Sequence, residues 1–185
     1  MTSQAFDKYL KNGNYHWRMF FEEKTPWYRE IMNTVNEFCQ GSCLDVGAGE
    51  AVLGKLITDK GYDYTGIDSD PVAIAMAKVL VPNGRFLNKD VKSPTRGVWD
   101  YMACVNVIEH LEHPEALLSI LEFNVKLGAI VITDNKDFPH EPSKYHVKEY
   151  TLDELLEFFR PYKPRGFELG YGQFIGVEIK KEQVS

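Results

Sequence analysis

The 185-residue sequence has few cysteines and no long apolar segment. Cys39, Cys43 and Cys104 are an odd number and lack the spacing of a zinc site or a disulfide framework. No stretch approaches the roughly 20 apolar residues that span a bilayer. Residues 1–15 are polar and lack the apolar centre of a signal peptide. We therefore expect a cytoplasmic protein with reduced thiols and no membrane partner.

Positive charge is also scarce. The chain has 21 lysines and arginines against 27 aspartates and glutamates, a formal net charge of -6. Nucleic-acid-binding domains usually carry a basic patch or stripe. The one local basic cluster, Arg160, Lys163 and Arg165 among prolines, is typical of a solvated turn. A nucleic-acid partner is disfavoured, and we expect a small-molecule substrate.

The chain instead alternates short apolar runs with helical patterns. Strands are predicted at residues 43–46, 63–67, 85–87, 101–105, 129–133, 167–171 and 174–180. Such alternation indicates a parallel sheet with helices on both faces. The last two runs are too close for a helical crossover and must form an antiparallel hairpin. We expect a doubly wound α/β fold with a mostly parallel seven-stranded sheet. Residues 1–40 would form a helical lid or packing segment, and residues 41–185 one domain.

Several local signals mark the ends of the predicted helices. Thr25 is placed to cap a helix that starts at Pro26, and Gly61 suits the end of a helix over residues 51–60. Other helices are predicted over residues 71–80 and from residue 114. Thr151 and Glu154 have the spacing of a capping box, ahead of an apolar stripe ending at Phe159.

A glycine turn follows the first predicted strand. Asp45, Gly47 and Gly49 lie where the strand turns into a helix, a place where glycine lets the backbone approach a ligand closely. Residue 52 is Val, so the spacing is not that of a dinucleotide-binding turn. Asp68 ends the next strand, where a carboxylate can accept both ribose hydroxyls. The pattern favours a nucleoside ligand without a pyrophosphate.

These residues resemble the class I S-adenosylmethionine-dependent methyltransferases over residues 43–180. Asp45, Gly47 and Gly49 resemble their first motif, and Asp68 their ribose-binding acid. Residues 88–91 resemble the loop whose acid receives the adenine amino group. Residues 105–111 resemble the fourth motif of ubiquinone-biosynthesis-like small-molecule methyltransferases. The resemblance implies a methyltransferase with S-adenosylmethionine as cofactor. The implied cofactor-binding residues are Asp45, Gly47, Gly49, Asp68, Asp90, Val91 and Asn106.

Three details of this motif set leave alternatives open. Ala51 stands where the family pattern has a third glycine, and we expect its methyl group only to crowd the helix start slightly. Asp68 also suits a helix cap, because Ser69, Asp70 and Pro71 follow it. Asp90 also suits a turn in which its side chain accepts from its own backbone.

The acceptor side is marked by histidines and aromatics. His110 follows the fourth predicted strand at the edge where doubly wound sheets bind ligands, and histidine suits a base near neutrality. We expect His110 to act as the base toward a hydroxyl acceptor, with His146 as the second catalytic candidate. The long connection over residues 135–150 should overhang the site. The expected substrate-contacting residues are Tyr15, His16, Trp17, Glu109 and Tyr150.

Two other functions remain open. Glu109, His110 and His146 resemble part of the metal set of small-RNA 3′-terminal ribose methyltransferases. Asn106 stands where those enzymes place a further glutamate, and an amide is a poor replacement for a carboxylate ligand. We therefore expect no metal site. The second alternative is a catalytically silent cofactor-binding domain that serves a partner protein.

Overall fold

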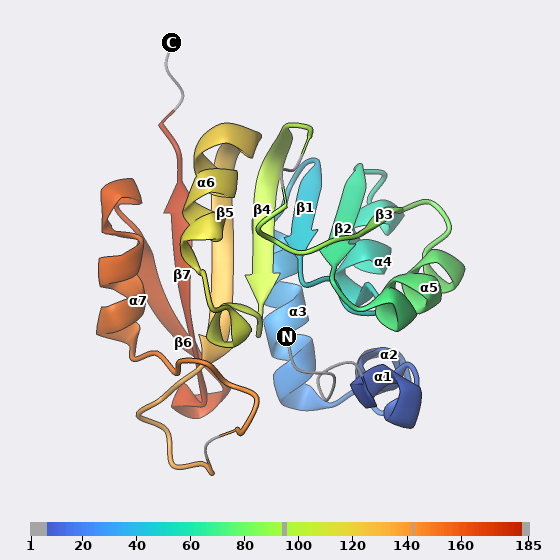
Figure 1. The fold of residues 1–185 in the computed structure, drawn as a ribbon, viewed down its shortest axis with the longest axis horizontal. Coiled ribbons are helices and arrows are strands. Elements are labelled where there is room, and N and C mark those ends of the chain that lie inside the picture. Colours follow the sequence, from blue (N-terminus) through green and yellow to red (C-terminus); the bar gives the residue numbers. More distant parts are fainter. Residues whose placement is uncertain (1–6, 94–95, 142, 183–185) are drawn as a thin grey trace.

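The fold is a seven-stranded sheet with helices on both faces (Figure 1). The computed structural model describes residues 7–93, 96–141 and 143–182. The strand order is β3-β2-β1-β4-β5-β7-β6, and every pair from β3 to β5 is parallel. β7 is antiparallel to both β5 and β6, which confirms the predicted terminal hairpin. The strands are β1 (Cys43–Val46), β2 (Tyr64–Asp68), β3 (Arg85–Asn88), β4 (Trp99–Val105), β5 (Val125–Asp134), β6 (Arg165–Leu169) and β7 (Phe174–Lys180).

Successive residues of a strand pack in two separate hydrophobic clusters, because their side chains point alternately to the two faces of the sheet. Cys43 packs in the cluster with α3 (Pro26–Phe38), α4 (Val52–Asp59) and α5 (Pro71–Leu80). Leu44 packs on the opposite face with α6 (Glu115–Asn124) and α7 (Leu152–Phe158). The three-layer architecture expected from the sequence is therefore confirmed.

The structure differs from the sequence predictions at the start of β5, at one helix cap and at Ala51. β5 begins at Val125, four residues before the predicted strand, because α6 runs directly into it at Asn124. Thr151 and Glu154 do form a capping box at α7. Thr25, by contrast, makes no capping hydrogen bond to α3. Ala51 has a left-handed backbone with φ of 64°, so its cost is conformational rather than crowding, roughly 1–2 kcal/mol for a residue with a Cβ.

The carboxyl ends of the parallel strands gather two segments from distant parts of the sequence (Figure 1). The N-terminal segment, which we define as residues 8–22, contains most of α1 (Asp7–Asn12), α2 (Tyr15–Trp17) and a π-helical turn (Arg18–Glu22). It lies beside the ends of β1 and β2. The connection from β5 to α7 lies at the same edge, below β4 and β5. This edge therefore carries the loops from which a site can be built.

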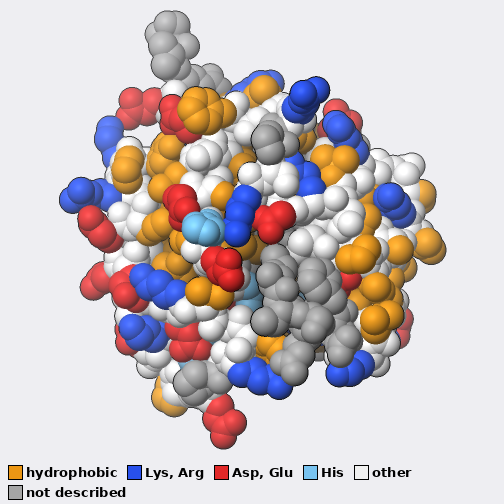
Figure 2. Space-filling model, in the orientation of Figure 1, with side chains coloured by type: hydrophobic (Ala, Val, Ile, Leu, Met, Phe, Trp, Pro, Cys, Tyr) orange, Lys and Arg blue, Asp and Glu red, His pale blue; other side chains and the backbone are white. Residues whose placement is uncertain are grey.

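None of the described helices is long and apolar enough to cross a membrane. Figure 2 shows one face of the molecule, on which acidic and basic side chains are interspersed. On that face the lysines and arginines do not gather into the continuous stripe that nucleic-acid binding would favour.

Candidate functional site

A cavity of about 830 Å³ opens at the carboxyl edge of the sheet. Its size is within the range of ordinary small-molecule sites. The cavity joins the glycine turn, the ends of β2 and β4, the N-terminal segment and the loop after β5. Of the predicted site residues, those lining it are Asp45, Gly47, Gly49, Asp68, Asp90, Val91, Asn106, Glu109, His110, His146 and His16.

The glycine turn needs glycine for two separate reasons. Gly47 and Gly49 have φ of 76° and 54°, in the left-handed region where a Cβ is costly. A Cβ at Gly47 would also overlap the side chain of Val107 from the turn after β4. The backbone N–H of Gly47 donates to the carbonyl of Ile67 at 2.8 Å, which fixes the turn against β2. The turn thus presents bare backbone to the cavity, as close approach of a ligand requires.

Asp68 is held at the cavity by backbone amides rather than by helix capping. Its Oδ2 accepts from the N–H of Gly49 at 2.9 Å and its Oδ1 from the N–H of Asp70 at 2.8 Å. The residue that caps α5 is Asp70, whose Oδ1 accepts from Val72 and Ala73. Each oxygen of Asp68 keeps a further lone pair for a ligand hydroxyl. Burial raises the pKa of this carboxyl, against the lowering effect of the two amides.

Asp45 is buried at the floor of the cavity with a partner that the sequence analysis missed. The hydroxyl of Tyr64 donates to Asp45 Oδ2 at 2.6 Å, and only 6% of Asp45 is exposed. Burial raises the pKa of Asp45 to about 7, although the hydrogen bond from Tyr64 lowers it. A cationic group of a ligand would compensate this carboxylate once it is ionised.

The remaining predicted cofactor residues lie on two loops. Asp90 Oδ1 accepts from the N–H of Lys92 at 2.9 Å, which is the local turn that the sequence left open. Its position on the cavity wall is compatible with a ligand contact as well. Asn106 has φ of 51°, and its buried Oδ1 has no hydrogen-bond partner in the described part of the chain. Both loops therefore leave acceptors at the cavity.

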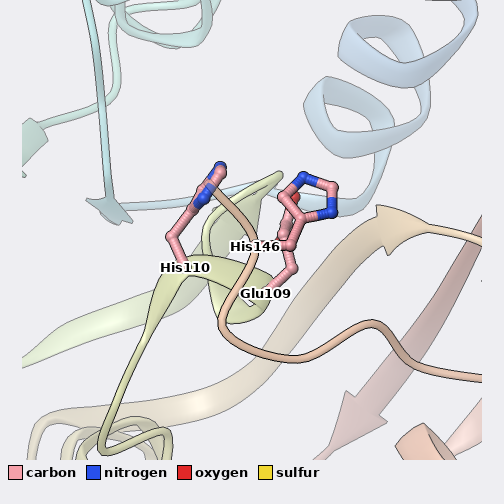
Figure 3. Close-up of side chains that lie close together, drawn as sticks. All are labelled: Glu109, His110 and His146. Carbon is pink, nitrogen blue, oxygen red and sulfur yellow. The ribbon is translucent and has the colours of Figure 1, made fainter. Parts of the chain in front are cut away.

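Glu109, His110 and His146 come together at the acceptor side of the cavity. Glu109 and His110 lie in the short turn after β4 (Ile108–His110), whereas His146 comes from the loop after β5. One ligand-type atom from each of the three residues lies within 4.8 Å of the other two. Figure 3 shows both imidazole rings rising to the same side of the chain, with the Glu109 side chain behind the His146 ring. The backbone carbonyl of Glu109 accepts from Val147 at 2.7 Å, which ties the two segments together.

The hydrogen bond of the His110 ring defines its protonated nitrogen, and the His146 ring has an acidic neighbour at each nitrogen. Nδ1 of His110 lies 3.0 Å from the carbonyl oxygen of Tyr145, which can only accept, so Nδ1 carries the hydrogen. Nδ1 of His146 lies 3.0 Å from Glu149 Oε1, and its Nε2 lies 3.7 Å from Asp134 Oδ2. His146 is thus flanked by two carboxylates. His110 is exposed, and its Nε2 makes no hydrogen bond with the described residues.

Glu109 is a buried carboxyl without a matching donor. Only 1% of the residue is exposed, and neither carboxylate oxygen has a hydrogen-bond partner in the described part of the chain. Burial raises the pKa of Glu109 to about 7, although the residue's own backbone amide and the nearby Thr133 hydroxyl lower it. A carboxylate left in this state is costly unless a cation or a donor compensates it. The geometry therefore provides an unsatisfied acceptor next to two histidines.

Three of the expected substrate contacts lie elsewhere. Tyr150 is 2% exposed and packs in the core with α6 and α7, because the chain turns inward there to start α7. Trp17 packs on Phe21, with ring centroids 4.5 Å apart. The ring centroids of Tyr15 and His16 are 3.9 Å apart. Neither Tyr15 nor Trp17 is among the described residues that line the cavity. Tyr15 and Trp17 shape the N-terminal segment, and of the aromatic residues 15–17 only His16 is among the described residues that line the cavity.

The sequence analysis also missed the role of Glu50. This residue follows the glycine turn directly and is 1% exposed. Its carboxylate accepts from the backbone N–H groups of His16 and Trp17 and contacts the His16 ring. The signal was available in the sequence, because a glutamate beside a buried glycine turn needs partners. Which partners it would find depends on the fold of a segment more than 30 residues away.

Known proteins that are similar to this chain are methyltransferases. Residues 21–169 match the family model of a methyltransferase domain. The mitochondrial ubiquinone biosynthesis O-methyltransferase of Schizosaccharomyces pombe is 30% identical over 56% of this chain and 41% of its own length. The ubiquinone biosynthesis O-methyltransferase of Pseudomonas paraeruginosa is 25% identical over 74% of this chain and 64% of its own length. The chain thus spans less than two thirds of these relatives.

A solved structure has the same fold over nearly the whole chain. Magnesium protoporphyrin IX methyltransferase from Synechocystis, with bound S-adenosylhomocysteine, has a TM-score of 0.75 at 14% identity, covering 98% of this chain and 100% of that one. The family match extends over most of the sequence and includes the glycine turn and the turn after β4. The expected membership of this family is confirmed. The chain belongs to the class I S-adenosylmethionine-dependent methyltransferases.

Proposed function

We propose that this protein transfers a methyl group from S-adenosylmethionine to a hydroxyl of a small molecule. Two relatives that it matches are named O-methyltransferases. The cavity is large enough for a cofactor and a small acceptor together. The observation that carries the proposal is the exposed imidazole of His110 at the same cavity as the glycine turn.

The residues fit the cofactor at three places. Gly47 and Gly49 line the cavity with backbone in the left-handed region, which suits close approach by the methionyl part. Asp68 has acceptor capacity for two ribose hydroxyls, and Asp90 with Val91 lies on the wall where adenine would lie. Asp45 is placed to pair with a cationic group. The cofactor supplies an activated methyl group when bound, and these residues hold it in orientation.

His110 is suited to the base by its tautomer. Because Nδ1 is used by the carbonyl of Tyr145, Nε2 holds the free lone pair. His110 would take the proton from the acceptor hydroxyl while the oxygen attacks the methyl carbon. The methyl carbon would come from the bound cofactor, whose sulfur would keep the electron pair of the broken carbon–sulfur bond. His146, between Asp134 and Glu149, would instead contact and orient the acceptor.

A second candidate is favoured by the same cluster. Glu109, His110 and His146 also fit a divalent cation, since Glu109 has two unpartnered oxygens and both rings have Nδ1 occupied by an acceptor. Histidine ligands commonly donate their other N–H in this way. A cation would act as a Lewis acid on the acceptor oxygen. Asn106 follows the same strand with an unpartnered oxygen but supplies no second carboxylate.

Chelation separates the two candidates. The purified protein would be assayed against a panel of small hydroxyl acceptors before and after treatment with a chelator. Turnover that survives chelation supports His110 as a free base. Turnover that is lost and then restored by magnesium, manganese or zinc supports the cation. Tight binding of S-adenosylhomocysteine with no transfer to any acceptor would contradict both and favour the silent binding domain.

A further inference from the structure

We propose that Glu50 is a positioning residue that fastens the N-terminal segment over the cofactor cavity and thereby limits the rate at which the cofactor leaves. The inference concerns a residue outside the set that contacts cofactor or acceptor. It depends on a cofactor bound at the glycine turn, and it does not depend on the acceptor or on the base. Failure of methyl transfer therefore has no bearing on it.

The contact is made by two consecutive residues of the segment. Glu50 Oε1 accepts from the backbone N–H of His16 at 2.6 Å and from that of Trp17 at 3.1 Å. Glu50 Oε2 lies 3.1 Å from Nδ1 of the His16 ring. Burial alone would raise the pKa of Glu50, but the hydrogen bonds and charge of His16 and the amide of Trp17 lower it. The ionised carboxylate is thus the form that the docked segment stabilises.

Burial makes this contact more than a surface ion pair. Glu50 is 1% exposed, so a carboxylate there cannot rely on water. Leaving a buried charge without donors is strongly unfavourable, and hydrogen bonds to charged groups are among the stronger ones. Movement of His16 and Trp17 away from the sheet removes three contacts together. The three contacts that hold the N-terminal segment beside the glycine turn therefore form and break together.

The docked segment forms a wall of the cofactor cavity. Lys8, Tyr9 and His16 line the same cavity as Gly49 and Asp68. The hydroxyl of Tyr9 lies so close to Gly49 that a Cβ at that glycine would overlap it. A ligand resting on the glycine turn is therefore covered by the segment from that side.

Ring contacts extend the docking from the segment to the core. The His16 ring stacks on Tyr28 of α3, with centroids 5.4 Å apart and planes at 19°. Tyr28 itself is buried in the cluster under the sheet. The Glu50 contact thus lies between a covered ligand site and a fixed aromatic anchor. Because Glu50 directly follows the glycine turn, loss of its contact with His16 and Trp17 would free the N-terminal segment next to the bound cofactor.

The test compares dissociation of S-adenosylhomocysteine from the wild type, Glu50→Ala and His16→Ala. Rates are measured by stopped-flow displacement, and amide exchange is followed in residues 8–22. We expect Glu50→Ala to release the ligand about tenfold faster or more, and His16→Ala severalfold faster. Exchange in the segment should slow when ligand binds to the wild type and should rise in both variants.

Asp100→Ala is the matched control. Asp100 Oδ2 accepts from the backbone N–H and hydroxyl of Ser42 at 2.9 and 2.7 Å, at the opposite edge of the sheet. The control loses a similar carboxylate–backbone contact and should keep the wild-type dissociation rate. If Glu50→Ala does not fold, His16→Ala carries the test with Glu50 in place. Unchanged dissociation in the folded variants, or segment exchange that ignores ligand, would overturn the proposal.

Discussion

Tyr64 donates a 2.6 Å hydrogen bond to Asp45 at the floor of the cofactor cavity. The two residues are diagonal neighbours across the β1–β2 pair, where Asp45 is paired with Gly66 and Cys43 with Tyr64. Burial raises the pKa of Asp45 from its ordinary value of 3.8 to about 7. Asp45, the first residue of the glycine motif, therefore makes the free energy of unfolding depend on pH.

The stability of the ligand-free protein should fall as the pH rises from about 4 to 7. In this window the folded state holds a proton on Asp45 that the unfolded state has lost. One such proton changes the free energy of unfolding by about 1.4 kcal/mol per pH unit. Asp45→Asn keeps an acceptor for Tyr64 but cannot titrate. We therefore expect the free energy of unfolding of the wild type, minus that of Asp45→Asn, to decrease steadily as the pH rises. Urea unfolding measures both values, and the contribution of Glu109 cancels because it is the same in the two proteins. Parallel curves would contradict the assignment.

His110→Gln should preserve cofactor affinity and lower kcat by about 10²- to 10⁴-fold, the usual contribution of a general base. The measurement is the kinetic profile, kcat and KM, with whichever hydroxyl acceptor the panel identifies. His146→Gln is the comparison, for which we expect a raised KM with a smaller change in kcat. A normal profile for His110→Gln would leave this residue only as part of the cavity wall.

Thr151→Ala should lower the free energy of unfolding by about 0.5–2 kcal/mol, because the capping box at α7 loses its side-chain acceptor. Thr25→Ala should have little effect, since Thr25 makes no capping hydrogen bond to α3. Chemical denaturation of both variants checks the pair. Equal losses would show that the two threonines have the same role, contrary to the hydrogen bonds seen.

The sequence was sufficient for the sheet, and the residues predicted to bind the cofactor line one cavity at its carboxyl edge. The apolar runs and the hairpin spacing are local signals, and β1, α5 and β7 have the predicted bounds. Asp68 and Gly49 were identified because the motif places both within 20 residues at one sheet edge. The hydrogen bond between them was not predictable from spacing, since it depends on the turn geometry.

The acceptor side depended on contacts between distant segments. Tyr150 and Tyr145 look alike in sequence, yet one is buried in the core and the other supplies its carbonyl to His110. The partner of Glu50 could not be inferred because His16 reaches it across 34 residues. Tertiary packing rather than local pattern decides which aromatic residues face the cavity.

We expect the cofactor to lie between the glycine turn and Asp68. Calorimetry with S-adenosylhomocysteine on the wild type and Asp68→Ala tests it directly. Asp100→Ala is the control, because Asp100 lies at the opposite edge of the sheet and is not among the described residues that line the cavity. The account predicts wild-type binding in the micromolar range and no binding of a nicotinamide dinucleotide. It predicts at least tenfold weaker binding by Asp68→Ala, because two hydrogen bonds to a charged group are lost. Equal affinity of the wild type and Asp68→Ala would contradict it.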